Sequence, residues 1–177
     1  MAVPENSDVP IGSLPAPQPG VVVMMCGLAG SGKTTYARRL EARGYIRLSV
    51  DEIIWRRIGH DAALLDPTEH EQHQATADQE LQEELIRLMA ARQPVVLDKS
   101  FWNRATRDRY KALIEGHGST WILVYLKADP DTLRRRLAIR NAQDGPSSVT
   151  VSPELLDRYL MSFEEPRDEG EHTILQS

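Results

Sequence analysis

No part of this 177-residue sequence limits its possible folds as strongly as residues 21 to 34. Val21 to Cys26 is an unbroken apolar run that ends at a glycine, which is typical of a strand buried on both faces of a parallel sheet. A glycine-rich stretch follows, and residues 33 to 43 then favour a helix that ends at Gly44. Residues 45 to 50 return to an apolar, extended pattern, so the sequence predicts a β-loop-α-β unit.

The glycine-rich stretch satisfies the pattern G-x-x-x-x-G-K-[ST] between a buried strand and a helix, which is the setting of a Walker A phosphate loop. Glycines let the backbone wrap around phosphate, while free amides at the helix start attract its charge. Lys33 would reach the β- and γ-phosphates, and Thr34 would bind Mg²⁺. A plain tight turn is the alternative, but it explains no lysine-threonine pair. We expect ATP to contact Gly27, Ala29, Gly30, Ser31, Gly32, Lys33, Thr34 and Thr35.

Further strand and helix signals alternate along the rest of the chain. They predict a three-layer α/β/α fold of the P-loop NTPase type, with a mostly parallel sheet of four to five strands and a helical lid. Strands are expected at 95–97 and 121–126, and at 173–175 if a short fifth strand forms. Helices are expected to begin near Glu52, Asp66-Pro67, Asn103, Asp129-Pro130 and Ser152-Pro153.

The two ends of the chain differ in composition. Residues 1–19 are rich in proline and poor in large apolar side chains, so we expect a disordered leader before a single domain at 20–177. The polar stretch 141–150 is a candidate lid loop. No apolar run approaches the ~20 residues of a membrane span, and no secretion signal is evident, so a cytoplasmic protein is expected. The single cysteine, Cys26, is expected in the core.

Asp51 follows the second predicted strand, at the edge where open α/β sheets bind ligands. A carboxylate there could orient an acceptor hydroxyl and take its proton, so Asp51 is a candidate catalytic base and acceptor contact. The alternative is that Asp51 only caps the helix that contains Glu52 to Arg57.

Asp98 ends the third predicted strand, which is the form of a Walker B acid that supports Mg²⁺. A simple turn aspartate is the alternative. Phe101 and Trp102 follow at the same edge of the sheet. They are candidates for lining the acceptor site, although burial in the core is as well supported by their chemistry.

Two groups of arginines are candidate anion-binding residues. Arg136 and Arg140 lie one helical turn apart and would stabilise the transferring phosphoryl group from the lid, whereas Arg134 and Arg135 read as solvated. Arg104 and Arg107 are candidate substrate contacts. For Arg104, an ion pair with Asp108 four residues later is an equal alternative.

The formal charge of −5 argues against a protein whose main task is to grip a nucleic-acid backbone. The five histidines are scattered, and His70 and His73 lack a further convincing metal ligand, so we read them as surface residues.

With these motifs in order, residues 21 to 163 resemble the small P-loop kinases grouped around phage polynucleotide kinase, zeta toxin and chloramphenicol phosphotransferase. The likeness is greatest to bacterial AAA-type ATP-binding proteins of uncharacterised substrate, through the Phe101-Trp102-x-Arg104-x-x-Arg107 run. The resemblance implies a role as phosphate loop for residues 27–34, as base for Asp51, and as lid charges for Arg136 and Arg140.

The sequence therefore predicts an ATP- and Mg²⁺-dependent kinase that phosphorylates a hydroxyl of a small molecule, such as an antibiotic or nucleoside. A polynucleotide 5′-hydroxyl is a weaker alternative acceptor. A nucleotide-dependent switch that uses residues 68–92 as a partner surface is the rival from another class. The sequence leaves open the choice between ATP and GTP, and the oligomeric state.

Overall fold

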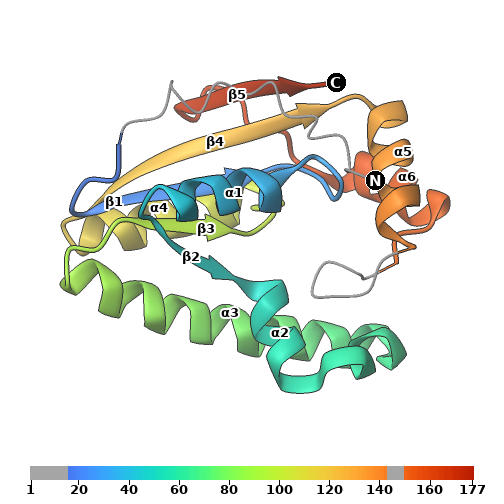
Figure 1. Cartoon of the computed structure of the whole chain (residues 1–177), viewed down its shortest axis with the longest axis horizontal. Coiled ribbons are helices and arrows are strands. Elements are labelled where there is room, and N and C mark those ends of the chain that lie inside the picture. Colours follow the sequence, from blue (N-terminus) through green and yellow to red (C-terminus); the bar gives the residue numbers. More distant parts are fainter. Residues whose placement is uncertain (1–15, 143–149) are drawn as a thin grey trace.

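A five-stranded, all-parallel sheet in the order β2-β3-β1-β4-β5 forms the centre of the protein, and confirms the predicted α/β fold (Figure 1). The computed structural model describes residues 16–142 and 150–177. Most of the predicted leader and most of the predicted lid loop lie outside these residues. The strands are β1 Val21–Cys26, β2 Ile46–Ser49, β3 Val95–Asp98, β4 Thr120–Ala128 and β5 Glu171–Gln176.

Helices cover both faces of the sheet, because alternate residues of the buried strands face opposite ways. Val22 and Met24 of β1 pack with α3 and α4, whereas Val23 and Met25 pack with α1. Cys26 is buried beside the first pair, as expected. The helices are α1 Lys33–Ala42, α2 Val50–Ile58, α3 Pro67–Ala90, α4 Arg104–Gly116, α5 Pro130–Arg140 and α6 Pro153–Ser162, with a 3₁₀ segment, η2, at Gly59–Leu64.

Side-chain caps fix where most helices begin. Asp66, Asn103, Asp129 and Ser152 each accept a backbone N–H of the following helix, which confirms the predicted starts. The capping alternative for Asp51 is wrong, since α2 takes its cap from Ser49. That hydroxyl accepts the Glu52 backbone N–H at 3.3 Å, and this leaves the Asp51 side chain available for another role.

The last strand is longer than the predicted residues 173–175. β5 pairs with β4 from Leu123–Glu171 to Ala128–Gln176. The polar residues of β5 hid the apolar pattern that marks a strand, because an edge strand keeps one side of its surface in contact with water. The sheet therefore has a full strand on the far side of β4.

All five strands point their carboxyl ends toward the end of the molecule that holds α2, α5 and α6 (Figure 1). There, Leu28 of the glycine-rich loop packs with Leu133 and Leu137 of α5 and with Leu156 of α6. This small third core fixes α5 and α6 directly against the glycine-rich loop.

Candidate active site

The loop between β1 and α1 has the backbone geometry of a phosphate cradle. Gly27 has φ 149°, and a Cβ atom there would lie 2.7 Å from the carbonyl oxygen of Leu126. Gly32 precedes α1 with φ 94°, and α1 has no side-chain cap. Amides at the start of α1 therefore remain open to an anion, as the sequence pattern predicts.

Lys33 lies at the centre of this loop. Its Nζ donates to the carbonyl oxygen of Leu28 at 2.9 Å. Burial lowers the pKa of the Lys33 ammonium, and the carboxylates of Asp98 and then Asp51 oppose that shift. The structure thus brings the two predicted acids close to the predicted phosphate-binding lysine.

Asp51 is the second residue of α2, directly after β2. Burial raises the pKa of its carboxyl, and the charge of Asp98 adds to the shift; Lys33, Arg140 and then His70 act in the opposite direction. The residue itself remains exposed, so protein surrounds the carboxyl without sealing it from solvent. A carboxyl with a raised pKa at an open sheet edge is well suited to accept a proton.

Asp98 ends β3 and lies opposite Ser49 of β2 in the strand register. Its Oδ2 accepts a hydrogen bond from Nη1 of Arg47 at 2.9 Å, and both side chains are almost fully buried. Our sequence analysis missed Arg47. The available signal was its place two residues before Ser49, which puts it on the same face of β2 as the residue facing Asp98.

Arg136 and Arg140 approach the site from α5. Nη1 of Arg136 lies 3.4 Å from the carbonyl oxygen of Gly30, and Nη2 lies 2.9 Å from that of Ser177. Burial lowers the pKa of both guanidinium groups, while Asp51 and then Tyr159 oppose the shift at Arg140. Arg136 therefore contacts the glycine-rich loop, and Arg140 lies near Asp51.

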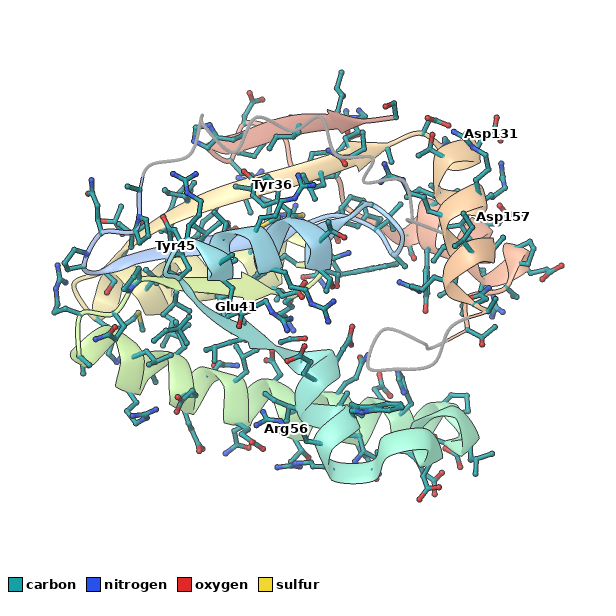
Figure 2. The ribbon with its side chains drawn as sticks, viewed as in Figure 1. Tyr36, Glu41, Tyr45, Arg56, Asp131 and Asp157 are labelled. Atoms are coloured by element: carbon teal, nitrogen blue, oxygen red, sulfur yellow. The ribbon has the colours of Figure 1, made fainter. Side chains whose placement is uncertain are left out.

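The other two arginines of α5, Arg134 and Arg135, have structural partners, as expected for a solvated face. Arg134 bridges Asp131 of α5 and Asp157 of α6, each at 3.0 Å, and Figure 2 shows these two acids on the adjoining helices. Arg135 donates to the hydroxyl of Thr132 at 3.1 Å.

Of the two aromatic residues after β3, only Trp102 lies toward the lid. Its ring meets Tyr159 and Phe163 edge-on, with centroids 5.0 and 5.8 Å apart. Phe101 is fully buried against Tyr110, so the core alternative holds for Phe101.

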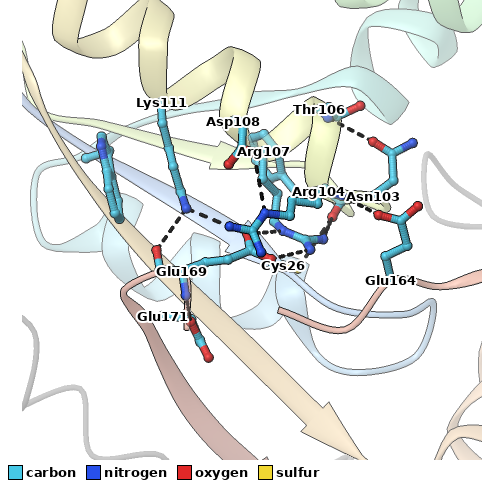
Figure 3. Close-up of polar contacts among 12 residues, drawn as sticks. Cys26, Asn103, Arg104, Thr106, Arg107, Asp108, Lys111, Glu164, Glu169 and Glu171 are labelled. Carbon is cyan, nitrogen blue, oxygen red and sulfur yellow. Dashed lines mark hydrogen bonds and ion pairs between the residues drawn. The ribbon is translucent and has the colours of Figure 1, made fainter. Parts of the chain in front are cut away.

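Arg104 and Arg107 do not form a common anion site. Arg104 pairs with Asp108 at 3.5 Å on the surface of α4. Arg107 is fully buried, where Nε and Nη2 each donate to Glu169 at 2.7 Å (Figure 3). These contacts engage Arg107 inside the protein rather than at a substrate site.

The residues present fit Mg²⁺ that arrives with a nucleotide. In residues 16–142 and 150–177, no group of three or more His, Cys, Asp or Glu side chains forms a site for a metal ion. Mg²⁺ commonly needs only one or two protein oxygens in addition to phosphate oxygens and waters. Thr34, in the first turn of α1, and Asp98 would supply such oxygens.

Comparison with known families shows which family the chain belongs to. The sequence profile of the AAA domain family AAA_33 matches residues 22–166, which include the loop, both acids and the lid arginines. The chain belongs to this AAA domain family. UPF0200 protein PAE1629 of Pyrobaculum aerophilum is similar in sequence to this AAA domain protein. The two are 28% identical over 129 residues, which cover 73% of this chain and 71% of the relative.

Solved structures share the fold of the AAA domain protein at low sequence identity. A provisionally assigned kinase from Chloroflexus aurantiacus has a TM-score of 0.72 and 22% identity, over 89% of each chain. Kti12 of Chaetomium thermophilum, solved with ADP-AlF3, has a TM-score of 0.66 and 17% identity, over 87% of this chain and 88% of its own. A gluconokinase from Sinorhizobium meliloti has a TM-score of 0.58 and 22% identity, over 90% of this chain and 83% of its own.

These likenesses establish the fold of a small P-loop kinase-like protein, as the sequence resemblance implied. Within its described residues, the AAA domain protein has no helix long and apolar enough to cross a membrane.

Proposed function

We propose that this protein is an ATP-dependent phosphotransferase that moves the γ-phosphate of ATP to a hydroxyl group of a small molecule. The observation that carries the proposal is the meeting of Lys33, Asp51, Asp98 and Arg140 at one end of the sheet. Of these four residues, only Lys33 is part of a phosphate loop. Asp51 adds an acceptor side, and Arg140 adds a positive charge beside it.

Each group has a place in the transfer. The loop amides and Lys33 bind the phosphates, and Arg136 and Arg140 stabilise charge on the transferring group. Thr34 and Asp98 would hold Mg²⁺, which would neutralise negative charge on the phosphates. The acceptor oxygen bonds to the γ-phosphorus as the bond to the bridging oxygen of ADP breaks. The hydroxyl proton passes to Asp51.

The composition of the segment that follows Asp51 favours a small molecule over a polynucleotide. Between Arg57 and Arg87, the segment formed by the end of α2, η2 and most of α3 contains neither Lys nor Arg. Its acidic residues are Asp61, Asp66, Glu69, Glu71, Asp78, Glu80, Glu83 and Glu84. A segment without basic side chains offers no attraction to a phosphate backbone. The gluconokinase and the sugar kinase from Janibacter sp. among the similar structures also support a small hydroxylated acceptor.

An acceptor screen tests this proposal. The protein is incubated with γ-labelled ATP and Mg²⁺, together with nucleosides, aminoglycoside-like compounds, simple sugars or 5′-hydroxyl oligonucleotides. Lys33→Ala is the blank, since it removes the phosphate-binding ammonium. We expect label on a small-molecule acceptor with the wild-type protein alone. Label on oligonucleotides only would support the polynucleotide alternative.

The rival from another class is a nucleotide-dependent switch that uses the exposed side of α3, Pro67–Ala90, as a partner surface. In that case label would appear only as inorganic phosphate with every acceptor, and exchange of ADP for ATP would change partner binding. Transfer of label to an acceptor separates the two functions.

A further inference from the structure

Arg47 is a buried charge that has no part in the phosphoryl-transfer steps proposed above. It lies on β2, an edge strand of the sheet, but only 6% of its side chain is exposed. In the strand register, Arg47 lies opposite Val96 and Ser49 lies opposite Asp98. The Arg47 side chain therefore shares the α1 face of the sheet with Asp98.

The guanidinium of Arg47 joins three other elements. Nη1 donates to Asp98 at the end of β3 at 2.9 Å, and Nη2 donates to Glu52 of α2. Nε lies 3.4 Å from Glu41, which Figure 2 shows on α1. Burial opposes the charge of Arg47, but the hydrogen bond to Glu52 and the nearby carboxylates outweigh it and raise the pKa. Arg47 thus remains a fixed cation.

This fork holds the Asp98 carboxylate directly and, through Glu52, the helix that carries Asp51. Its bond to Asp98 uses Oδ2, which fixes the rotation of the carboxylate and directs Oδ1 elsewhere. Its bond to Glu52 holds the first turn of α2, where Asp51 is the adjacent residue. A planar guanidinium restrains two carboxylates at once, whereas an ammonium group acts as a point charge.

We infer that Arg47 is a positioning residue that orients Asp98 toward nucleotide-bound Mg²⁺ and ties it to the helix that carries Asp51. This inference rests on the proposed function, because it assigns Asp98 to the metal. It makes a distinctive prediction, since a positive charge that only lay close to the metal would weaken metal binding rather than support it.

The test measures how much Mg²⁺ strengthens nucleotide binding. The dissociation constant of a fluorescent ATP analogue is determined in EDTA and in Mg²⁺ for the wild type, Arg47→Met and Arg47→Lys, and Mn²⁺ binding is followed by EPR. Arg57→Met is the matched control, because Arg57 pairs with Glu80 on the surface between α2 and α3.

We expect Arg47→Met to lose at least about tenfold of the Mg²⁺ enhancement, equivalent to about 1.4 kcal/mol. Its affinity in EDTA should stay within about twofold of wild type, because the loop amides and Lys33 are intact. Arg47→Lys should fall between the two, and Arg57→Met should match wild type. An unchanged or larger enhancement in Arg47→Met would overturn the inference.

Two further outcomes are also decisive. If Arg47→Met does not fold, Glu52→Gln replaces it, because this change removes the charge that anchors Nη2 and so loosens the guanidinium that orients Asp98. A reduced Mg²⁺ enhancement in Glu52→Gln supports the role, and an unchanged one overturns it. If the wild-type protein shows no Mg²⁺ enhancement at all, it is the proposed function that fails.

Discussion

The buried ion pair between Arg107 and Glu169 gives the sharpest stability prediction. Two nitrogens of Arg107 each donate to a different oxygen of Glu169 at 2.7 Å, and Nη1 donates to the carbonyl oxygen of Phe101 at 2.9 Å (Figure 3). Lys111 adds a contact of 3.6 Å to Glu169. The Arg107 and Glu169 side chains are 0% and 2% exposed, so water cannot replace either partner.

Glu169→Gln keeps the size of the side chain but leaves Arg107 as a buried charge without its carboxylate. Breaking such a pair costs about 3–5 kcal/mol. For a domain of this size, about 2–4 °C of Tm is lost per kcal/mol, so we expect Tm to fall by about 6–20 °C. The measurement is urea unfolding at pH 7 together with a thermal melt.

The pH dependence provides a second check of the same pair. Its hydrogen bonds with Arg107 hold the pKa of Glu169 below the ordinary value, although burial opposes this shift. The stabilisation is therefore complete above the ordinary glutamate pKa of about 4.3, and is lost as pH falls through the lower pKa of the folded state. The difference between wild type and Glu169→Gln should be constant near neutral pH and shrink below about pH 4.

Asp108→Asn is the control, because Asp108 forms an exposed pair with Arg104 on the same helix, and it should leave stability unchanged. If Glu169→Gln unfolds within about 1 kcal/mol of wild type at pH 7, the reasoning about this buried pair is refuted.

Three further predictions follow from single contacts. Burial raises the pKa of Cys26 to about 12, so a thiol reagent should modify it only after denaturation; rapid labelling of the native protein would contradict its burial. Gly27→Ala would place a Cβ 2.7 Å from the Leu126 carbonyl oxygen, so ATP affinity should fall by about tenfold or more in a binding titration, and full affinity would refute the loop geometry. Because the pKa of Asp51 is raised, the transfer rate should be lost as pH falls through a midpoint above the ordinary value of about 3.9, and an acid limb below that value would argue against Asp51 as base.

Local signals explain why much of the fold was predictable from the sequence. The apolar run of β1 and the glycine-rich loop that follows it are adjacent in the chain, so their pattern is visible without tertiary contacts. The helix starts at Asp66 and Asn103 depend on hydrogen bonds that span only three residues. For the same reason, the places of Asp51 and Asp98 at strand ends are visible in the sequence.

Contacts between distant residues explain what the sequence did not reveal. Arg107 and Glu169 are 62 residues apart, and Arg47 and Asp98 are 51 apart. A spacing of three residues from Arg104 therefore said nothing about the partner of Arg107. The full length of β5 was also not visible in the sequence. Its polar residues show no apolar pattern, and the strand is held by backbone pairing with β4, which the sequence does not reveal.

The most direct test of the kinase assignment is the fate of the γ-phosphate in Asp51→Asn. With the acceptor identified in the screen, wild-type protein should transfer label to the acceptor hydroxyl. Asp51→Asn should bind ATP within about twofold of wild type, since the loop is intact, and should lose transfer by about 10²-fold or more, as expected for removal of a general base. Unchanged transfer by Asp51→Asn would contradict the account.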